Sequence, residues 1–253
     1  MANERQERAA RAEQMRKERE KADRRQRNLI SVAIFVVVVA LIAVGGYAVK
    51  SASDDNKENT KLVAPKGVNS DYGFEYDAVA AGGKAGADPV KVILTEDFQC
   101  PACKSFETQS GAFLADQVKR GEITIEYRPI SFLDSRSGNE YATRALNAAL
   151  CVLDKGGVTK FKIMHDLLYA NQPEENTSGP EDAELVSTAD SAGVPGLKTC
   201  IISKRFGPWI EDATAALQKD GFEGTPWVRI DGKTIKAPTP QALQMAIDAA
   251  KAA

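Results

Sequence analysis

The stretch from Val90 to Cys103 reads VKVILTEDFQCPAC and joins a short apolar run to a Cys-Pro-Ala-Cys motif. Apolar residues dominate the first five positions, which predicts a short buried strand. Pro101 follows the first cysteine, and proline suits the first turn of a helix because its missing N–H has no helical partner there. The stretch therefore predicts a strand, a Cys-x-x-Cys motif and a helix, in that order.

The residues after the motif complete a βαβ unit. Phe106, Leu114 and Val118 recur at helical spacing, and Gly121 is placed to end the helix. Residues 123–127 then alternate apolar and polar side chains, which predicts a second strand. We therefore expect the cysteine pair between two strands, at the start of the helix that connects them.

The remaining sequence predicts a helical block, a hairpin and a last helix. Periodic apolar positions favour helices over residues 138–154, 158–170, 181–192, 196–203 and 206–219. Asp231-Gly232 joins two short extended runs, and this pair tolerates the positive φ of a hairpin turn. A final helix is expected over residues 239–252. The order βαβ, helical block, ββα predicts an α/β fold with an inserted α-helical domain.

An uncharged run of 21 residues, Leu29–Val49, precedes these elements. As a helix rising 1.5 Å per residue it would span a hydrocarbon core of about 30 Å. A cleaved signal peptide is the alternative, although its apolar region usually covers only about 7–15 residues. Arginines at 24, 25 and 27 precede the run, and the positive-inside tendency then keeps the N-terminus in the cytoplasm. We expect an uncleaved transmembrane anchor.

This anchor divides the chain into four expected parts. Residues 1–28 form a charged cytoplasmic arm, 29–49 the transmembrane helix, 50–70 a polar linker, and 71–253 an extracytoplasmic globular domain. Residues 1–28 carry ten Lys or Arg and six Asp or Glu, so the other 225 residues have a net charge of −6, since the whole chain carries −2. This net negative charge argues against nucleic acid as a partner, because phosphate selects basic surfaces.

The small number of histidines and cysteines limits the possible chemistry. The only histidine, His165, excludes a two-histidine zinc motif and lies in an apolar helical stripe, where a packed or capped role is expected. Zinc usually needs two close ligand pairs, whereas Cys151 and Cys200 stand alone. A permanent staple between Cys100 and Cys103 would close only a tiny loop and stabilise little. No metal or organic cofactor is expected.

A redox couple fits the cysteine pair better. The first sulfur lies at a helix N-terminus, where unpaired N–H groups and the helix dipole favour a thiolate. The thiolate is the nucleophile in disulfide exchange. We expect Cys100 to attack or be attacked, and Cys103 to resolve the mixed disulfide.

Four segments in order carry a resemblance to a known family: EDFQCPACKSFE, EYRPISFLDSRSGNEYATRALNAALC, FKIMHDLLYANQ and GTPWVRIDG, which start at residues 96, 126, 161 and 224. Together they resemble the DsbA-like thiol–disulfide oxidoreductases, and within them the membrane-anchored bacterial subgroup. The resemblance covers about residues 71–253. It implies a thioredoxin fold interrupted by a helical domain at about 132–222.

The resemblance also implies roles for residues outside the motif. Pro226, preceded by Thr225, falls on the family's cis-proline, which faces the cysteine pair and lies beside the bound substrate. Cys151 and Cys200 lie in the helical block, where the relatives have an extra disulfide. Outside the membrane these two cysteines most simply pair with each other. A second, shuttling couple is the alternative.

Two positions depart from the family pattern. Ala102 stands where the strongest oxidants have histidine, which suggests a less oxidising couple. Leu94 stands where many relatives have an acidic residue, and the acids here are Glu96 and Asp97. We expect these two to be solvated loop or helix-start carboxylates, with a proton relay to Cys103 as the alternative.

Three functional hypotheses follow. The first is an anchored oxidoreductase that introduces disulfides into secreted or cell-envelope proteins, and the family implies reoxidation by a quinone-linked membrane oxidase of the DsbB or VKOR type. The second is a reductase or isomerase, for example in cytochrome maturation, that uses the same couple in the other direction. The third is a non-catalytic module that binds partners beside Pro226.

Overall fold

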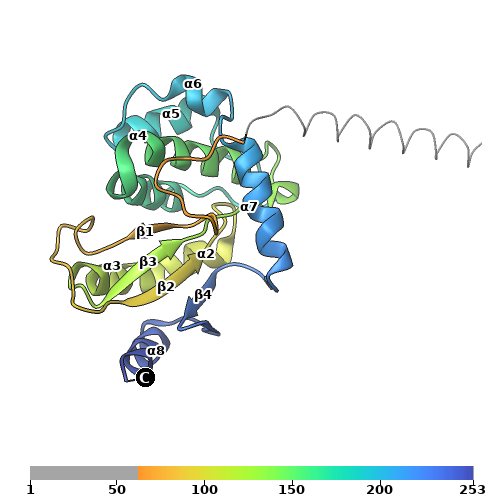
Figure 1. Cartoon of the computed structure of the whole chain (residues 1–253). Coiled ribbons are helices and arrows are strands. Elements are labelled where there is room, and N and C mark those ends of the chain that lie inside the picture. The colour runs from red at the N-terminus through yellow and green to blue at the C-terminus, as the bar shows by residue number, and fades with distance from the viewer. Residues whose placement is uncertain (1–61, 253) are drawn as a thin grey trace, which may run out of the picture. The chain divides into compact units, whose positions relative to one another are not determined.

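The computed structural model describes residues 62–252, which form one mixed β-sheet with helices packed against it (Figure 1). The strands are β1 (Phe74–Tyr76), β2 (Val90–Thr95), β3 (Ile123–Tyr127), β4 (Trp227–Ile230) and β5 (Lys233–Thr234). Their order across the sheet is β1-β3-β2-β4-β5. Strands β2 and β3 run parallel, as the predicted βαβ unit requires, and the other pairs are antiparallel.

Strand β1 is an element that the sequence does not predict. It has three residues, too few for an alternating pattern to stand out. It pairs with β3 so that Phe74 lies opposite Tyr127. The expected linker also ends earlier than residue 70, because Pro65 is buried and the Lys66 N–H donates a hydrogen bond to Asp154 Oδ1 at 3.0 Å.

A continuous helical run connects β2 to β3. It consists of α2 (Pro101–Phe106), the π-helical segment η1 (Glu107–Gly111) and α3 (Ala112–Lys119). Gly121, at φ 74°, lies just beyond its end and adopts the left-handed conformation that glycine tolerates best. The helix was predicted, but its π-helical segment was not. Such segments occur often at functional sites.

The helical block between β3 and β4 contains η2 (Asp134–Arg136), α4 (Tyr141–Ala170), α5 (Asp182–Ser191), α6 (Lys198–Ile202) and α7 (Gly207–Lys219). Figure 1 shows α4, α5 and α6 gathered on the side of the sheet where the edge strand β1 lies, with α7 leading back to β4. The two helices predicted on either side of Gly157 are the halves of α4. The chain turns there, at φ 76° and ψ 178°.

The chain ends as predicted, in a hairpin and the helix α8 (Pro240–Lys251). Asp231 and Gly232 have φ values of 51° and 72°, the positive φ that a tight two-residue hairpin needs. Thr239 caps α8, since its hydroxyl oxygen accepts a hydrogen bond from the Ala242 N–H.

The polar positions of β3 do not form an exposed face, although their alternation suggests one. Thr124 and Glu126 are buried along with their apolar neighbours. The Glu126 carboxylate forms ion pairs with Lys91 and Arg128, which compensates for its burial.

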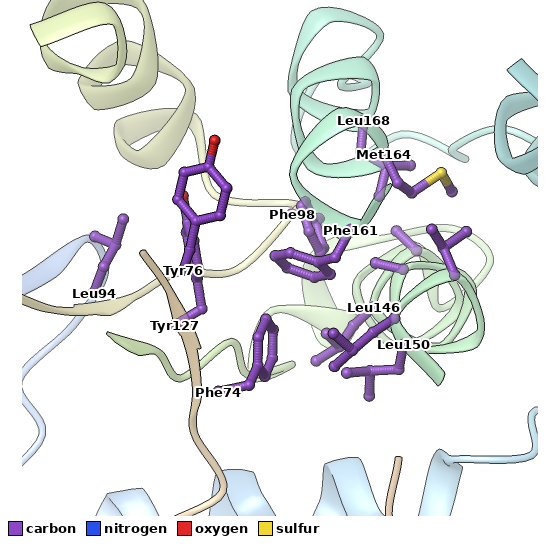
Figure 2. Packing of buried hydrophobic residues seen from close by; sticks show 14 of the residues in the cluster. Phe74, Tyr76, Leu94, Phe98, Tyr127, Leu146, Leu150, Phe161, Met164 and Leu168 are labelled. Carbon is purple, nitrogen blue, oxygen red and sulfur yellow. The ribbon is translucent and has the colours of Figure 1, made fainter. Parts of the chain in front are cut away.

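Aromatic packing joins the sheet to the helical block (Figure 2). The Phe161 ring of α4 lies 4.6 Å from the Phe74 ring and 5.4 Å from the Tyr127 ring, centroid to centroid. Burying one such side chain contributes about 1.5–3 kcal/mol. This packing holds the second half of α4 against the residues that follow β2, where Phe98 lies 5.2 Å from Tyr169.

Within the part of the chain that the structure describes, no helix is both long and apolar enough to cross a membrane. The predicted anchor at residues 29–49 and the arm before it lie outside the described residues.

Candidate active site

The two cysteines of the motif lie at the start of α2. Cys100 is the N-cap residue, with extended backbone angles of φ −76° and ψ 117°, and Pro101 occupies the first turn. Both thiols are free in this structure, and both side chains are buried, Cys103 completely. The predicted placement at a helix N-terminus is therefore correct.

The environment of Cys100 favours a thiolate. A hydrogen bond from the Cys103 thiol is the largest favourable cause and outweighs the opposing effect of burial, so the pKa of Cys100 falls to about 6. The Thr225 side chain and the N–H groups of Cys103 and Ala102 lower this pKa further. These N–H groups belong to the first turn of α2, which has no helical acceptors for them.

The environment of Cys103 has the opposite effect. Burial raises the pKa of Cys103 well above its usual value, and the hydrogen bond to Cys100 and the negative charge of Glu96 add to the rise. At neutral pH one thiol of the pair is therefore ionised and the other holds its proton. This asymmetry suits stepwise disulfide exchange, because the thiolate rather than the thiol is the attacking species.

The peptide bond between Thr225 and Pro226 is cis, and it faces Cys100. The Thr225 carbonyl oxygen lies 3.4 Å from Cys100 Sγ. Beside them is a groove of about 360 Å³, lined largely by apolar groups of Ala102, Phe106, Pro226 and Pro238. The structure thus brings the cysteine motif and the predicted proline together at the edge of an apolar groove.

The expectation that Glu96 and Asp97 are solvated is wrong, because the helical block covers both. Asp97 accepts hydrogen bonds from the N–H groups of Gln99 at 2.8 Å, Phe132 at 2.9 Å and Leu133 at 3.0 Å. Burial raises the pKa of Asp97 to about 7, although these bonds oppose the shift. Asp97 ties the loop before Cys100 to the start of the helical block.

Glu96 instead pairs with the lone histidine of α4. Its Oε2 lies 3.0 Å from His165 Nε2, and His165 Nδ1 lies 3.1 Å from Asp166 Oδ1. Burial raises the pKa of Glu96 to about 7. Although burial lowers the pKa of His165, its hydrogen bonds to Asp166 and Glu96 raise it to about 9.

The sequence predicts a packed or capped His165 and gives no sign of this pairing. Glu96 and His165 are 69 positions apart, and His165 lies within an ordinary apolar stripe. Ligand atoms of Glu96, Glu107 and His165 also lie within 4.8 Å of one another. Both ring nitrogens of His165 already have carboxylate partners, so we interpret this group as an ion-pair network rather than a metal site.

Gln172, just after α4, is a second residue that sequence reasoning missed. Its side-chain amide donates to the carbonyl oxygens of Phe98 at 2.9 Å and Cys100 at 3.0 Å. These bonds fix the backbone on which the Cys100 thiol is carried. No pattern in the sequence around Gln172 predicts such a contact.

Comparison with known proteins gives the family. The thioredoxin family model matches residues 80–249. The structure is similar to a disulfide bond oxidoreductase, DsbG, from Mycobacterium tuberculosis, with a TM-score of 0.60 and 31% identity over 68% of this chain and 84% of that one. The chain belongs to the DsbA-like branch of the thioredoxin family. DsbA from the same organism matches with a TM-score of 0.59 and 30% identity, over 72% of this chain and 98% of that one.

Curated relatives of this DsbA-like chain divide into two groups. A probable disulfide bond formation protein D from Bacillus cereus is 24% identical over 87% of this chain and 95% of its own length. The serine/threonine-protein kinase PknE of M. tuberculosis is 30% identical over 149 residues, and the chain spans only about a quarter (26%) of that protein. Because the DsbA and DsbG matches cover most of both chains, this DsbA-like chain is an oxidoreductase by family.

The remaining two cysteines of the DsbA-like chain form a disulfide that links α4 to α6. Cys151 and Cys200 are joined with a Cα–Cα distance of 6.1 Å and a sequence separation of 49. Cys151 is completely buried. This bond lies within the helical block, apart from the groove beside Pro226.

Proposed function

We propose that the Cys100–Cys103 couple introduces disulfides into secreted or cell-envelope proteins. The observation that carries this proposal is that, beside the Thr225–Pro226 groove, the pKa of Cys100 is lowered and that of Cys103 is raised. A low pKa at Cys100 stabilises the reduced couple and so makes its disulfide a better oxidant.

The reaction begins with the oxidised couple. A substrate thiolate attacks Cys100 Sγ, the Cys100–Cys103 bond breaks, and Cys103 leaves and takes up a proton. The second substrate thiolate then attacks the substrate sulfur of the mixed disulfide, which forms the substrate disulfide and releases Cys100 as a thiolate. Two electrons pass from the substrate to the couple.

Glu96 is the proposed proton donor and acceptor for Cys103. Its charge acts on the Cys103 thiol, and its Oε1 is buried without a hydrogen-bond partner among the described residues. A pKa of about 7 suits proton exchange at neutral pH. Asp97, the other candidate, has its carboxylate occupied by main-chain N–H groups and is proposed to hold the loop instead.

The substrate is proposed to lie as an extended segment in the groove beside Pro226. The chain is proposed to be anchored through Leu29–Val49 with its catalytic domain outside the membrane, and a quinone-linked membrane oxidase of the DsbB or VKOR type would reoxidise the couple.

Ala102, which adds no positive charge beside Cys100, favours the reductase or isomerase alternative.

Trapping mixed disulfides in cells tests the proposal. In full-length Cys103→Ser, Cys100 lacks its resolving partner, so we expect disulfide-linked adducts with envelope proteins that a reductant releases. The matched control is the double variant Cys100→Ser/Cys103→Ser, in which no adduct should form. Absence of adducts from Cys103→Ser would favour the non-catalytic binding module.

A further inference from the structure

A chain of hydrogen-bonded side chains leads from Glu96 to the protein surface. His165 bridges two carboxylates, with 3.0 Å from its Nε2 to Glu96 Oε2 and 3.1 Å from its Nδ1 to Asp166 Oδ1. The Glu96 and His165 side chains are only 4% and 2% exposed, whereas that of Asp166 is 53% exposed. The histidine ring therefore connects a buried acid to a solvated one.

Aromatic rings enclose the buried part of this chain. The rings of Phe98, Tyr127, Phe161 and Tyr169 lie with their centroids 4.9–5.9 Å from that of His165. Packing of this kind leaves little room for water, so the side chains themselves must carry any proton. The charged or titratable groups that surround Glu96 and His165 are Asp97, Cys103 on α2, Glu107 on η1, Tyr127 on β3, and Lys162, Asp166 and Tyr169 on α4.

Asp166, the exposed end of this hydrogen-bonded series, lines a recess between the α2–η1–α3 run and α4. This recess measures about 350 Å³ and is lined in part by Lys104, Glu107, Lys162 and Asp166. It shares no lining residue with the groove beside Pro226. The recess and the groove are therefore two separate pockets.

The π-helical segment η1 contributes to the same recess. Glu107 begins η1, and its carboxylate lies within 4.8 Å of the ligand atoms of Glu96 and His165. Lys162, one helical turn from Asp166 on α4, lies beside the Asp166 carboxylate and holds it at the recess.

We propose that His165 and Asp166 conduct the proton of Cys103 between Glu96 and this recess. The proposal rests on the proposed function, because it requires Cys103 to gain and lose a proton during turnover. The helical block would then supply the proton path for the buried cysteine of the thioredoxin core. The path lies away from the substrate groove, so proton exchange continues while a substrate is bound.

The proton balance can be written for reoxidation by oxidised glutathione. The Cys100 thiolate attacks glutathione disulfide, forms a mixed disulfide and releases one glutathione thiolate. Cys103 then passes its proton to Glu96, attacks Cys100 Sγ and displaces the second glutathione thiolate. Glu96 passes the proton to Nε2 of the neutral His165 ring, whose own proton is on Nδ1, and the ring, now protonated on both nitrogens, releases the Nδ1 proton to Asp166, from which it reaches solvent. Two electrons pass from the thiols to glutathione.

The two steps of this reaction differ in whether they need the proton path. Formation of the mixed disulfide needs only the Cys100 thiolate, whereas its resolution needs the Cys103 proton to leave. We therefore compare both rates in reduced wild type, Asp166→Asn and His165→Gln, using oxidised glutathione from pH 6 to 9. Acid quenching followed by mass spectrometry counts the mixed disulfide. Asp116→Asn, an exposed aspartate of α3 paired with Arg120, is the matched control.

The expected result is selective. In Asp166→Asn and His165→Gln the mixed disulfide forms at the wild-type rate but resolves at least about tenfold more slowly at pH 7, because general acid–base catalysis contributes about 10²–10⁴-fold. In these variants the rate of its resolution then rises about tenfold per pH unit, since hydroxide must remove the proton. Asp116→Asn behaves as wild type.

Two results would overturn the proton path. Wild-type resolution across the pH range in both variants would show that the path is not used. Equal slowing of both steps would show a damaged site rather than a lost proton path. Since glutathione replaces the protein substrate in this assay, the trapping of envelope proteins remains a separate test, and the failure of one proposal can be told from the failure of the other.

Discussion

Cys100 Sγ lies 3.4 Å from the carbonyl oxygen of Thr225, although 125 positions separate the two residues. The contact joins the start of α2 to the residue before Pro226 and β4. It places the Cys100 sulfur at the edge of the groove beside Pro226, where the proposed substrate would lie.

The first prediction concerns the acidity of Cys100. In the reduced protein one thiol should titrate with a pKa of about 6, because the Cys103 thiol and the first turn of α2 stabilise the Cys100 thiolate. Thiolate absorbance near 240 nm followed against pH measures it, with Cys100→Ser as control. A single transition at the usual pKa of about 8.5 would contradict this account of the site.

The second prediction links this acidity to stability. The pKa of Cys100 is lower in the folded protein, at about 6, than the ordinary pKa of 9.0 that a free thiol has in the unfolded chain. The stability it contributes is thus fully present above pH 9 and is lost as pH falls through 6. Urea unfolding should show the reduced protein gaining stability over the oxidised protein from pH 6 to 9. A difference that is flat or shrinks with rising pH would be inconsistent with a depressed Cys100 pKa.

The third prediction concerns the disulfide of the helical block. Replacing Cys151 and Cys200 together by Ala should lower the free energy of unfolding by about 4 kcal/mol, because the bond closes a long loop in the unfolded chain. The rate of glutathione exchange at Cys100 should stay near wild type. Loss of exchange in a variant that remains folded would support the shuttling role instead.

The fourth prediction concerns the structural role of Asp97. Asp97→Ala leaves the N–H groups of Gln99, Phe132 and Leu133 without their acceptor, the first of them buried and the other two partly buried, and should cost about 3 kcal/mol of unfolding free energy. Urea unfolding measures this, with the exposed Asp116→Ala as the reference. A cost below about 0.5 kcal/mol, typical of surface sites, would remove the structural role given to Asp97.

Local signals explain which parts of the fold could be predicted. Pro101 marks the start of α2, and Asp231-Gly232 marks the hairpin, since each favours one backbone conformation at its own position. The order of strands and helices around these signals was enough for the βαβ and ββα units. The three residues of β1 and the π-helical segment η1 give no comparable signal.

The buried part of the site could not be predicted because it depends on packing between distant segments. Glu96 lies in a loop-like sequence, and only the position of α4 makes it a buried partner of His165. Gln172 likewise reaches the Cys100 carbonyl from the far end of α4. Residues 69 to 72 positions apart leave no periodic pattern that would join them.

The reduction potential of the Cys100–Cys103 couple tests the central claim most directly. Known couples range from about −270 mV for thioredoxin to about −120 mV for DsbA. Equilibration with glutathione buffers, with Cys151–Cys200 intact, should give a potential above about −200 mV, because the Cys100 thiolate stabilises the reduced form. A potential below about −250 mV would contradict the proposed oxidase and favour a reductase.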